Sequence, residues 1–184
     1  MVSSRRVLIT GAGSGLGRAL AGRYAGSGAR VACADLVLER AEATRAGLAG
    51  TGHLACPVDV GSDEAMEQLR DRIIAEWGGL DVLINNAGIA SGGAMVETTM
   101  AEWRKILEVD LLSVVRGCRL FLPAMLSAGQ GQILSTASFA GLAGAPGIMS
   151  YGVAKAGVVA LSEQLRAEVQ RNGIRVGVIC PSFF

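Results

Sequence analysis

The chain has 184 residues, a formal net charge of +1 and a hydrophobic fraction of 51%, values typical of one globular domain with a full core. The near-zero charge gives no electrostatic reason to expect nucleic acid or an anionic membrane as a partner. Four cysteines lie far apart without a C-x-x-C pattern, so we expect reduced thiols, a cytoplasmic protein and no metal site. The first residues lack the apolar core of a signal peptide, and we expect no membrane-spanning segment.

The first predicted element is a buried parallel strand at the apolar run Val7–Ile9. A glycine-rich turn follows, and a helical pattern begins near Leu16. A strand, a glycine turn and a helix form the arrangement that binds a dinucleotide. Glycines let the backbone approach a pyrophosphate, and the helix N-terminus offers free N–H groups to that anion. The spaced glycines of this turn are Gly11, Gly15 and Gly17.

A second apolar strand, Val31–Ala34, ends in Asp35. This acid lies near the offset of about 20 residues at which a carboxylate binds the adenosine ribose of a dinucleotide. The glycine turn alone is also compatible with an ordinary strand–helix loop. Asp35 therefore favours the dinucleotide interpretation.

The rest of the chain alternates between helical and strand patterns. Ser62 is the predicted N-cap of one helix, which Gly78-Gly79 ends. This alternation predicts a doubly wound parallel sheet, an α/β fold of the Rossmann type, in a single domain over residues 1–184. The further predicted strands span residues 54–58, 81–84, 133–137 and 175–180, and the further predicted helices span 38–48, 63–77, 100–126 and 151–171.

Polar residues and glycines follow the predicted strands, at the edge where open parallel sheets bind ligands. Taken singly, they are equally typical of turns. Tyr151 and Lys155 are more specific, because residues four apart share one face of a helix. An ammonium beside a phenol favours the phenolate, and such a tyrosine can exchange a proton with an alcohol or carbonyl oxygen. Ser138, after the preceding strand, can donate a hydrogen bond to the same oxygen.

These motifs resemble those of the short-chain dehydrogenase/reductase family. They occur in the family's order and cover essentially the whole chain. The segments that carry the resemblance are Thr10-Gly11-Ala12-Gly13-Ser14-Gly15-Leu16-Gly17, Asp59-Val60, Asn85-Asn86-Ala87-Gly88, Ser138 and Tyr151-Gly152-Val153-Ala154-Lys155.

The resemblance implies hydride transfer between a nicotinamide cofactor and an alcohol or ketone. It implies that Tyr151 is the general acid and base, that Lys155 supports it and holds the nicotinamide ribose, and that Ser138 stabilises the reacting oxygen. Asn85 is expected to brace the central sheet. The residues expected along the cofactor are Gly11, Ser14, Gly15, Leu16, Gly17, Asp35, Leu36, Asp59, Val60, Asn86, Ala87, Gly88, Tyr151, Lys155 and Pro181.

Asp35 also predicts which cofactor binds. A carboxylate accepts hydrogen bonds from both ribose hydroxyls and repels a 2′-phosphate. Members of the family that prefer NADP usually have a basic residue near the glycine turn or just after the second strand, where this chain has Ser14 and Leu36. We therefore expect NAD(H) rather than NADP(H).

The sequence departs from the family pattern at three places. The long helix has Asp110 where the family usually has Asn. The apolar stripe predicts that Asp110 points inward, where a carboxylate must be paired or protonated. It is a candidate catalytic relay residue, and the alternative is a structural kink or cap. Pro181-Ser182 replaces the usual Pro-Gly. The sequence stops at Phe184, whereas family members usually continue with a substrate-binding loop and a last strand, so the substrate cannot be deduced.

The two long helices, 100–126 and 151–171, are apolar on more than one stripe, which favours a homodimer or homotetramer over a helix packed only on its own sheet. Two alternatives to an NAD-dependent dehydrogenase stay open. One is a catalytically silent dinucleotide-binding sensor or interaction protein. The other is an NADPH-linked carbonyl or 3-oxoacyl reductase, which Asp35 disfavours.

Overall fold

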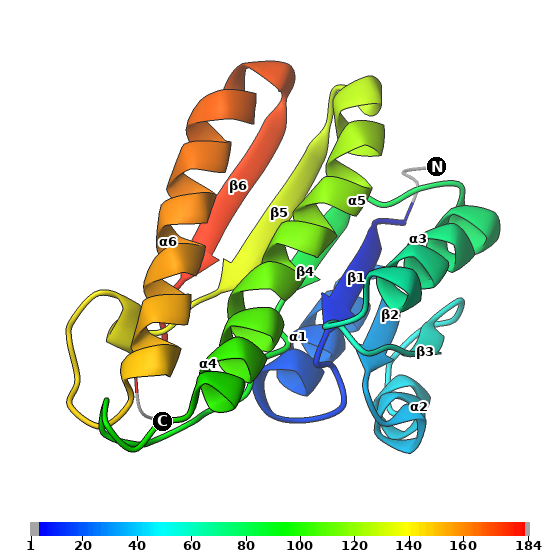
Figure 1. Ribbon diagram of the computed structural model, residues 1–184. Coiled ribbons are helices and arrows are strands. Elements are labelled where there is room, and N and C mark those ends of the chain that lie inside the picture. The colour runs from blue at the N-terminus through cyan, green and yellow to red at the C-terminus, as the bar shows by residue number, and fades with distance from the viewer. Residues whose placement is uncertain (1–3, 183–184) are drawn as a thin grey trace.

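A computed structural model describes residues 4–182 of the chain, and Phe184 lies outside them (Figure 1). Six parallel strands form one sheet in the order β3-β2-β1-β4-β5-β6, which confirms the predicted doubly wound Rossmann-type fold. The ends of the strands differ from the predicted ends by at most two residues. The strands are β1 (Arg6–Thr10), β2 (Arg30–Asp35), β3 (Leu54–Pro57), β4 (Val82–Asn85), β5 (Gly131–Thr136) and β6 (Ile174–Ile179).

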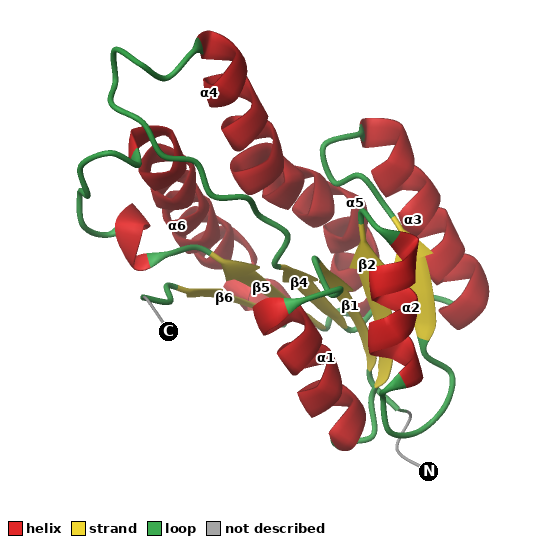
Figure 2. Cartoon of the chain, turned by 90° about the horizontal axis from the view of Figure 1, so that it is seen from below, coloured by secondary structure: helices red, strands yellow, loops and turns green. Residues whose placement is uncertain are grey.

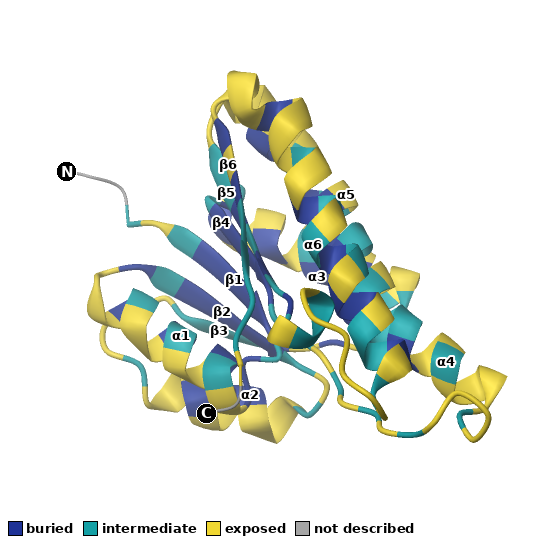
Figure 3. Cartoon of the chain, turned by 90° about the vertical axis from the view of Figure 1, so that its left-hand side faces the viewer, coloured by how far each residue is buried: buried dark blue, intermediate teal, exposed yellow. Residues whose placement is uncertain are grey.

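Helices cover both faces of the sheet, as Figure 2 shows. On one face, α1 (Gly15–Gly26) and α2 (Leu38–Ala46) pack over β1 and β2. On the other face lie α3 (Asp63–Trp77), α5 (Ser113–Ala128) and α6 (Met149–Val169). The core therefore divides into two apolar clusters, one on each side of the sheet, and the central strands β1, β2 and β4 are buried between them (Figure 3).

Helix α3 shows how local sequence sets these elements. The Ser62 hydroxyl accepts a hydrogen bond of 3.2 Å from the Ala65 N–H group, which confirms the predicted N-cap. The buried face consists of the predicted stripe of Met66, Leu69, Ile73 and Trp77. Gly78 ends the helix with φ of 71°, a left-handed conformation that favours glycine.

The predicted continuous helix over 100–126 was wrong in one respect. The segment is helical from Met100 to Ala128, but a π-helical turn at Glu108–Leu112 separates α4 (Met100–Leu107) from α5. By length and composition this helix could cross a membrane. Its side chains at Val114, Cys118, Phe121 and Met125 are instead buried against the sheet, so it belongs to the core layer of this fold.

The strand order fixes where ligands can bind. β1 lies between β2 and β4, so the chain leaves the two central strands β1 and β4 in opposite directions across the sheet. A crevice forms at such a switch point, beyond the carboxyl ends of the strands. The glycine turn after β1 and the segment Asn86–Gly88 after β4 both line this crevice and touch each other, since a Cβ atom at Gly11 would lie 2.9 Å from Ala87 Cα.

Candidate active site

The glycine turn places the start of α1 against the loop after β4. Gly11 has φ of 65° and Gly15 has φ of 48°, conformations that L side chains rarely adopt. A Cβ atom at Gly17 would lie 2.2 Å from the Gly11 carbonyl oxygen, whereas one at Gly15 would meet nothing within 4 Å. Gly17 is therefore required for packing, while Gly15 opens toward the crevice.

The N-terminus of α1 suits an anion. Ser14 is the N-cap and makes no side-chain capping hydrogen bond, and the first turn contains no acidic residue. The unpaired N–H groups and the partial positive charge of the helix end thus face the crevice without a competing carboxylate. Arg18 donates a hydrogen bond to the Gly13 carbonyl and so braces the turn from α1.

Asp35 lies beside this turn. Its Oδ2 accepts a hydrogen bond of 2.8 Å from the Gly13 N–H group, and its Oδ1 accepts one of 3.1 Å from the Val37 N–H group. These bonds hold the carboxylate at the mouth of the crevice, and each oxygen keeps a lone pair for a further donor. A ribose diol would supply two such donors.

A groove of about 750 Å³ runs along the crevice. Every predicted cofactor residue lines it except Tyr151, Lys155 and Pro181. The lining comes from the glycine turn with Asp35 and Leu36, from Asp59 and Val60 beyond β3, and from Asn86, Ala87 and Gly88 after β4. The groove is long and contains an anion-binding helix end and a carboxylate for a diol, so the residues present fit a dinucleotide.

Sequence reasoning missed several residues of this groove. Arg40, in the first turn of α2, lies beside Asp35, and its Cβ is 2.7 Å from the position that a Cβ of Gly13 would take. The signal for Arg40 was its place one helical turn after the second strand. Gly61 and Ile89 follow predicted motifs directly. Lys105, Glu108 and Val109 come from the long helix, and only the fold brings them to the groove.

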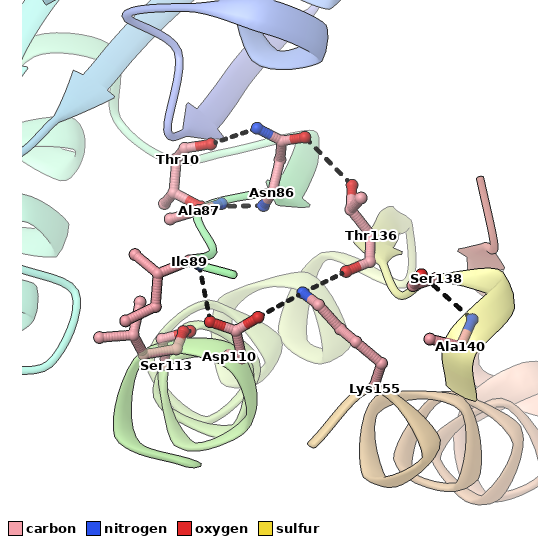
Figure 4. Close-up of polar contacts among 11 residues, drawn as sticks. Thr10, Asn86, Ala87, Ile89, Asp110, Ser113, Thr136, Ser138, Ala140 and Lys155 are labelled. Carbon is pink, nitrogen blue, oxygen red and sulfur yellow. Dashed lines mark hydrogen bonds and ion pairs between the residues drawn. The ribbon is translucent and has the colours of Figure 1, made fainter. Parts of the chain in front are cut away.

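Asn86 links the two halves of the sheet. Its Nδ2 donates 3.0 Å to the Thr10 carbonyl oxygen, and its Oδ1 accepts 3.2 Å from the Thr136 hydroxyl (Figure 4). Asn85 is buried, and its Oδ1 would lie 2.2 Å from a Cβ atom at Gly117, so it packs directly against α5. These contacts fix the end of β4 between β1 and β5.

A second pocket, of about 610 Å³, adjoins the groove and shares Leu16 and Asn86 with it. Ser138 and Tyr151 line this pocket together, and so does Pro181, which was expected from the sequence to lie along the cofactor and which lines this second pocket rather than the groove. The rest of the lining is mainly apolar and uncharged: Ala90, Ala137, Phe139, Ala140, Ala143, Ala145 and Ile148. The arrangement brings Ser138 and Tyr151 to one largely apolar cavity.

Ser138 lies two residues after the end of β5 and caps a short 3₁₀ turn, Phe139–Gly141. Its hydroxyl oxygen accepts a hydrogen bond of 3.2 Å from the Ala140 N–H group. The hydroxyl proton is thus left to donate into the pocket. This backbone contact also orients the side chain without any further residue.

Lys155 lies one turn after Tyr151 on α6, and its Nζ is 5.5 Å from the centre of the Tyr151 ring. The ammonium is buried. It donates 3.2 Å to the Thr136 carbonyl oxygen and makes an ion pair of 3.1 Å with Asp110 Oδ2. The predicted tyrosine and lysine thus come from α6, and the predicted serine comes from the loop that follows β5.

Asp110 points inward, as predicted. Its exposed fraction is 0%, and its Oδ1 accepts 2.8 Å from the Ile89 N–H group (Figure 4). Burial raises the pKa of the Asp110 carboxyl, while the Lys155 ammonium and the Ile89 N–H group act in the opposite direction. Asp110 is ion-paired and lies in the π-helical turn. Its role as a catalytic relay residue, with a structural kink or cap as the alternative, stays a prediction.

The comparisons with known proteins agree with this geometry. Residues 5–184 match the family model for short chain dehydrogenases. The chain is 37% identical over 176 residues to meso-2,3-butanediol dehydrogenase of Serratia marcescens, covering 96% of this chain and 70% of that protein. It is 35% identical over 176 residues to 3-oxoacyl-[acyl-carrier-protein] reductase of Escherichia coli, covering 96% and 72%.

A solved short chain dehydrogenase/reductase from Burkholderia phymatum, in complex with NAD, superposes with a TM-score of 0.94 at 32% identity. The match covers 98% of this chain and 66% of that one. Levodione reductase gives a TM-score of 0.92 at 34% identity, with 97% and 71% covered. The chain thus spans about two thirds of the length of these structures.

The fold, the groove and the family match define one class of protein: a dinucleotide-binding oxidoreductase. More particularly, the chain belongs to the short-chain dehydrogenase/reductase family.

Proposed function

We propose that this protein transfers a hydride between NAD(H) and a small alcohol or ketone, with Tyr151, Lys155 and Ser138 as its catalytic residues. One observation supports this most strongly. Tyr151 and Ser138 share an apolar pocket that opens onto the dinucleotide groove at Leu16 and Asn86. A carbonyl carbon held there faces the groove, and its oxygen faces both hydroxyls.

The bound nicotinamide supplies or accepts the hydride, and the residues of this chain manage the proton. When the alcohol is oxidised, the Tyr151 phenolate takes the proton of the substrate hydroxyl while the hydride leaves the carbon atom that bears this hydroxyl. When the ketone is reduced, the Tyr151 hydroxyl returns that proton to the oxygen. Ser138 donates a hydrogen bond to the oxygen, where negative charge develops. The Lys155 ammonium, 5.5 Å from the centre of the Tyr151 ring, would hold the nicotinamide ribose beside the Tyr151 hydroxyl.

The residues that would hold the dinucleotide follow from the groove. The N-terminus of α1, with Ser14 and Gly15, would hold the pyrophosphate, and Asp35 would bind the adenosine ribose. NAD(H) is favoured because Asp35 is fixed at the groove mouth by two backbone N–H groups. Arg40 in the same groove is the observation that favours the NADPH-linked alternative, as does the likeness to the acyl-carrier-protein reductase.

Replacing Tyr151 with Phe tests the proposed chemistry. The Tyr151→Phe variant keeps the ring and loses the proton, so turnover of alcohols or ketones should fall by about 10²- to 10⁴-fold. NADH affinity, measured by fluorescence titration, should be unchanged. Tyr24→Phe is the matched control, because Tyr24 packs in α1 away from the pocket. Equal turnover of Tyr151→Phe and the control would refute the role of Tyr151. If the wild-type protein binds NADH but turns over no alcohol or ketone, the silent-sensor alternative is favoured.

We also propose a cytoplasmic homo-oligomer built through the helices 100–126 and 151–171. Apolar side chains on these helices remain exposed, among them Leu112, Leu126 and Val153, and contact with a second copy would cover them. Equilibrium sedimentation that gave only a monomer would refute the assembly.

The cysteines of the described residues are free, and burial raises the pKa of the Cys118 thiol to about 11. Free thiols of this kind suit the reducing compartment of the proposed cytoplasmic protein.

A further inference from the structure

The ion pair between Asp110 and Lys155 is not required by the proton transfer described above. Both side chains are buried, and their charged atoms are 3.1 Å apart. A charge in such a place is costly unless it is paired and hydrogen-bonded. The second carboxylate oxygen is held by the Ile89 N–H group, so the carboxylate has a fixed position.

The surroundings leave the ammonium little freedom. Lys155 Nζ has three N–H donors, of which one faces Asp110 and one the Thr136 carbonyl oxygen. Gly88 closes over the pair, because a Cβ atom there would lie 3.1 Å from Lys155 Nζ and 3.3 Å from Asp110 Oδ2. The face of Lys155 that remains is the one toward the Tyr151 ring.

We propose that Asp110 is a positioning residue that fixes the Lys155 ammonium by direct ion pairing and so reduces the net positive charge that acts on the Tyr151 hydroxyl. The proposal deepens the proposed function, since it rests on Tyr151 as the acid and base. Its physical effect on Tyr151 can nevertheless be measured without substrate or cofactor.

The other charged groups around this cluster do not change the sign of the effect. On the π-helical turn, Glu108 makes an ion pair with Arg116. Lys105, on α4, lines the dinucleotide groove. From β5 and from the loop after β4, the groups that contact the pair are uncharged, namely the Thr136 carbonyl and the Ile89 N–H group. Among the described residues, Asp110 is therefore the anion in contact with Lys155.

The test is the ionisation of Tyr151, followed through the ultraviolet absorbance of tyrosinate as pH rises. Subtracting the spectrum of Tyr151→Phe isolates this residue, and the subtraction is made in two backgrounds, Asp110 and Asp110→Asn. Asn keeps an acceptor for the Ile89 N–H group and removes the charge. The substitution therefore removes the anionic partner that lies 3.1 Å from Lys155 Nζ.

The midpoint of Tyr151 ionisation should fall by about one pH unit in Asp110→Asn. Asp110 Oδ2 lies 3.1 Å from Lys155 Nζ, which lies 5.5 Å from the centre of the Tyr151 ring. One charge acting across these two contacts has an effect of about this size at an effective dielectric constant of about 20. The pH at which alcohol oxidation is half-maximal should fall in parallel. Asp81→Asn is the matched control, because this substitution also removes an ion pair, the one with Arg6. Asp81 lies just before β4, at the amino end of the strands and away from Tyr151. The control should leave the midpoint unchanged.

An unchanged or raised midpoint in a folded Asp110→Asn protein would overturn the inference. Near-ultraviolet circular dichroism checks the fold, and Asp110→Ser, which is smaller and keeps a hydroxyl acceptor, gives a second neutral variant. A lowered midpoint in Asp110→Asn supports the inference, whatever the turnover of Tyr151→Phe. If Tyr151→Phe retains full turnover, that turnover refutes the proposed function alone. A large loss of turnover in Tyr151→Phe with no midpoint change refutes the role of Asp110 alone.

Discussion

The choice between NAD(H) and NADP(H) can be tested at Asp35. In Asp35→Asn the side chain keeps its shape and loses its negative charge. One oxygen still accepts from a backbone N–H group, while the new NH₂ group cannot accept from the other. The substitution thus loosens the turn slightly and removes the repulsion that a 2′-phosphate would meet.

The size of the effect follows from the position of the carboxylate. Two unit charges 4 Å apart repel by about 1 kcal/mol in water and about 4 kcal/mol at an effective dielectric constant of 20. Asp35 is half-buried at the mouth of an open groove, so the lower part of this range applies. A repulsion of about 2 kcal/mol corresponds to a ratio of roughly 30 between the two affinities. We expect Asp35→Asn to lose most of this ratio, chiefly by a lower Kd for NADPH.

The assay is a fluorescence titration of wild type and variant with NADH and with NADPH at fixed ionic strength. Asp59→Asn is the matched control, because Asp59 lines the same groove and accepts a backbone N–H group, that of Gly61. The control should alter the affinity ratio less than Asp35→Asn does. Tighter NADPH binding by the wild type, or an equal change in both variants, would show that Asp35 does not select the cofactor.

Further predictions concern stability. Gly17→Ala places a Cβ atom 2.2 Å from the Gly11 carbonyl oxygen, so urea denaturation should show a loss of about 3 kcal/mol, whereas Gly22→Ala, with open space around it, should gain up to about 1 kcal/mol. The hydrogen bond from Arg6 lowers the pKa of Asp81 below 3.8. The pair therefore stabilises the fold above that pH and loses its effect as pH falls through the lowered value. Arg6→Gln should be less stable than wild type at pH 7, and the two should converge in more acidic buffer; a constant difference would contradict this linkage.

Much of the fold could be predicted because its signals are local. An apolar run such as Val7–Ile9 predicts a buried strand from its own side chains, and Ser62 and Gly78 mark the ends of α3 through contacts within one helical turn. The strand ends then place Asp35 and Asn86 on the same edge of the sheet, since parallel strands share that edge. The groove could therefore be assembled from the sequence.

The rest depends on contacts between distant parts of the chain. Nothing in the helical periodicity around Asp110 predicts one wider turn, because the apolar stripe continues through it. The ion pair with Lys155 joins residues 45 positions apart in the sequence, so the sequence showed only that a buried carboxylate would need a partner. Arg40 was missed because a basic residue was sought only near the glycine turn and just after the second strand, where the chain has Ser14 and Leu36. The catalytic roles of Ser138 and Tyr151 stay predictions.

The π-helical turn at Glu108–Leu112 also limits how the length of this segment can change. Such a turn holds one residue more than an α-helical turn, and each residue of an α-helix turns the chain by about 100°. Deleting a single residue here would therefore restore a regular helix and leave α4 and α5 on the faces that they now present, with Ile106 still buried. The deletion would instead change the wide turn itself, and with it the position from which Asp110 reaches Lys155. A gap placed within 108–112 when this chain is aligned with its relatives therefore marks a change in the turn around Asp110 and not a change of helix phase.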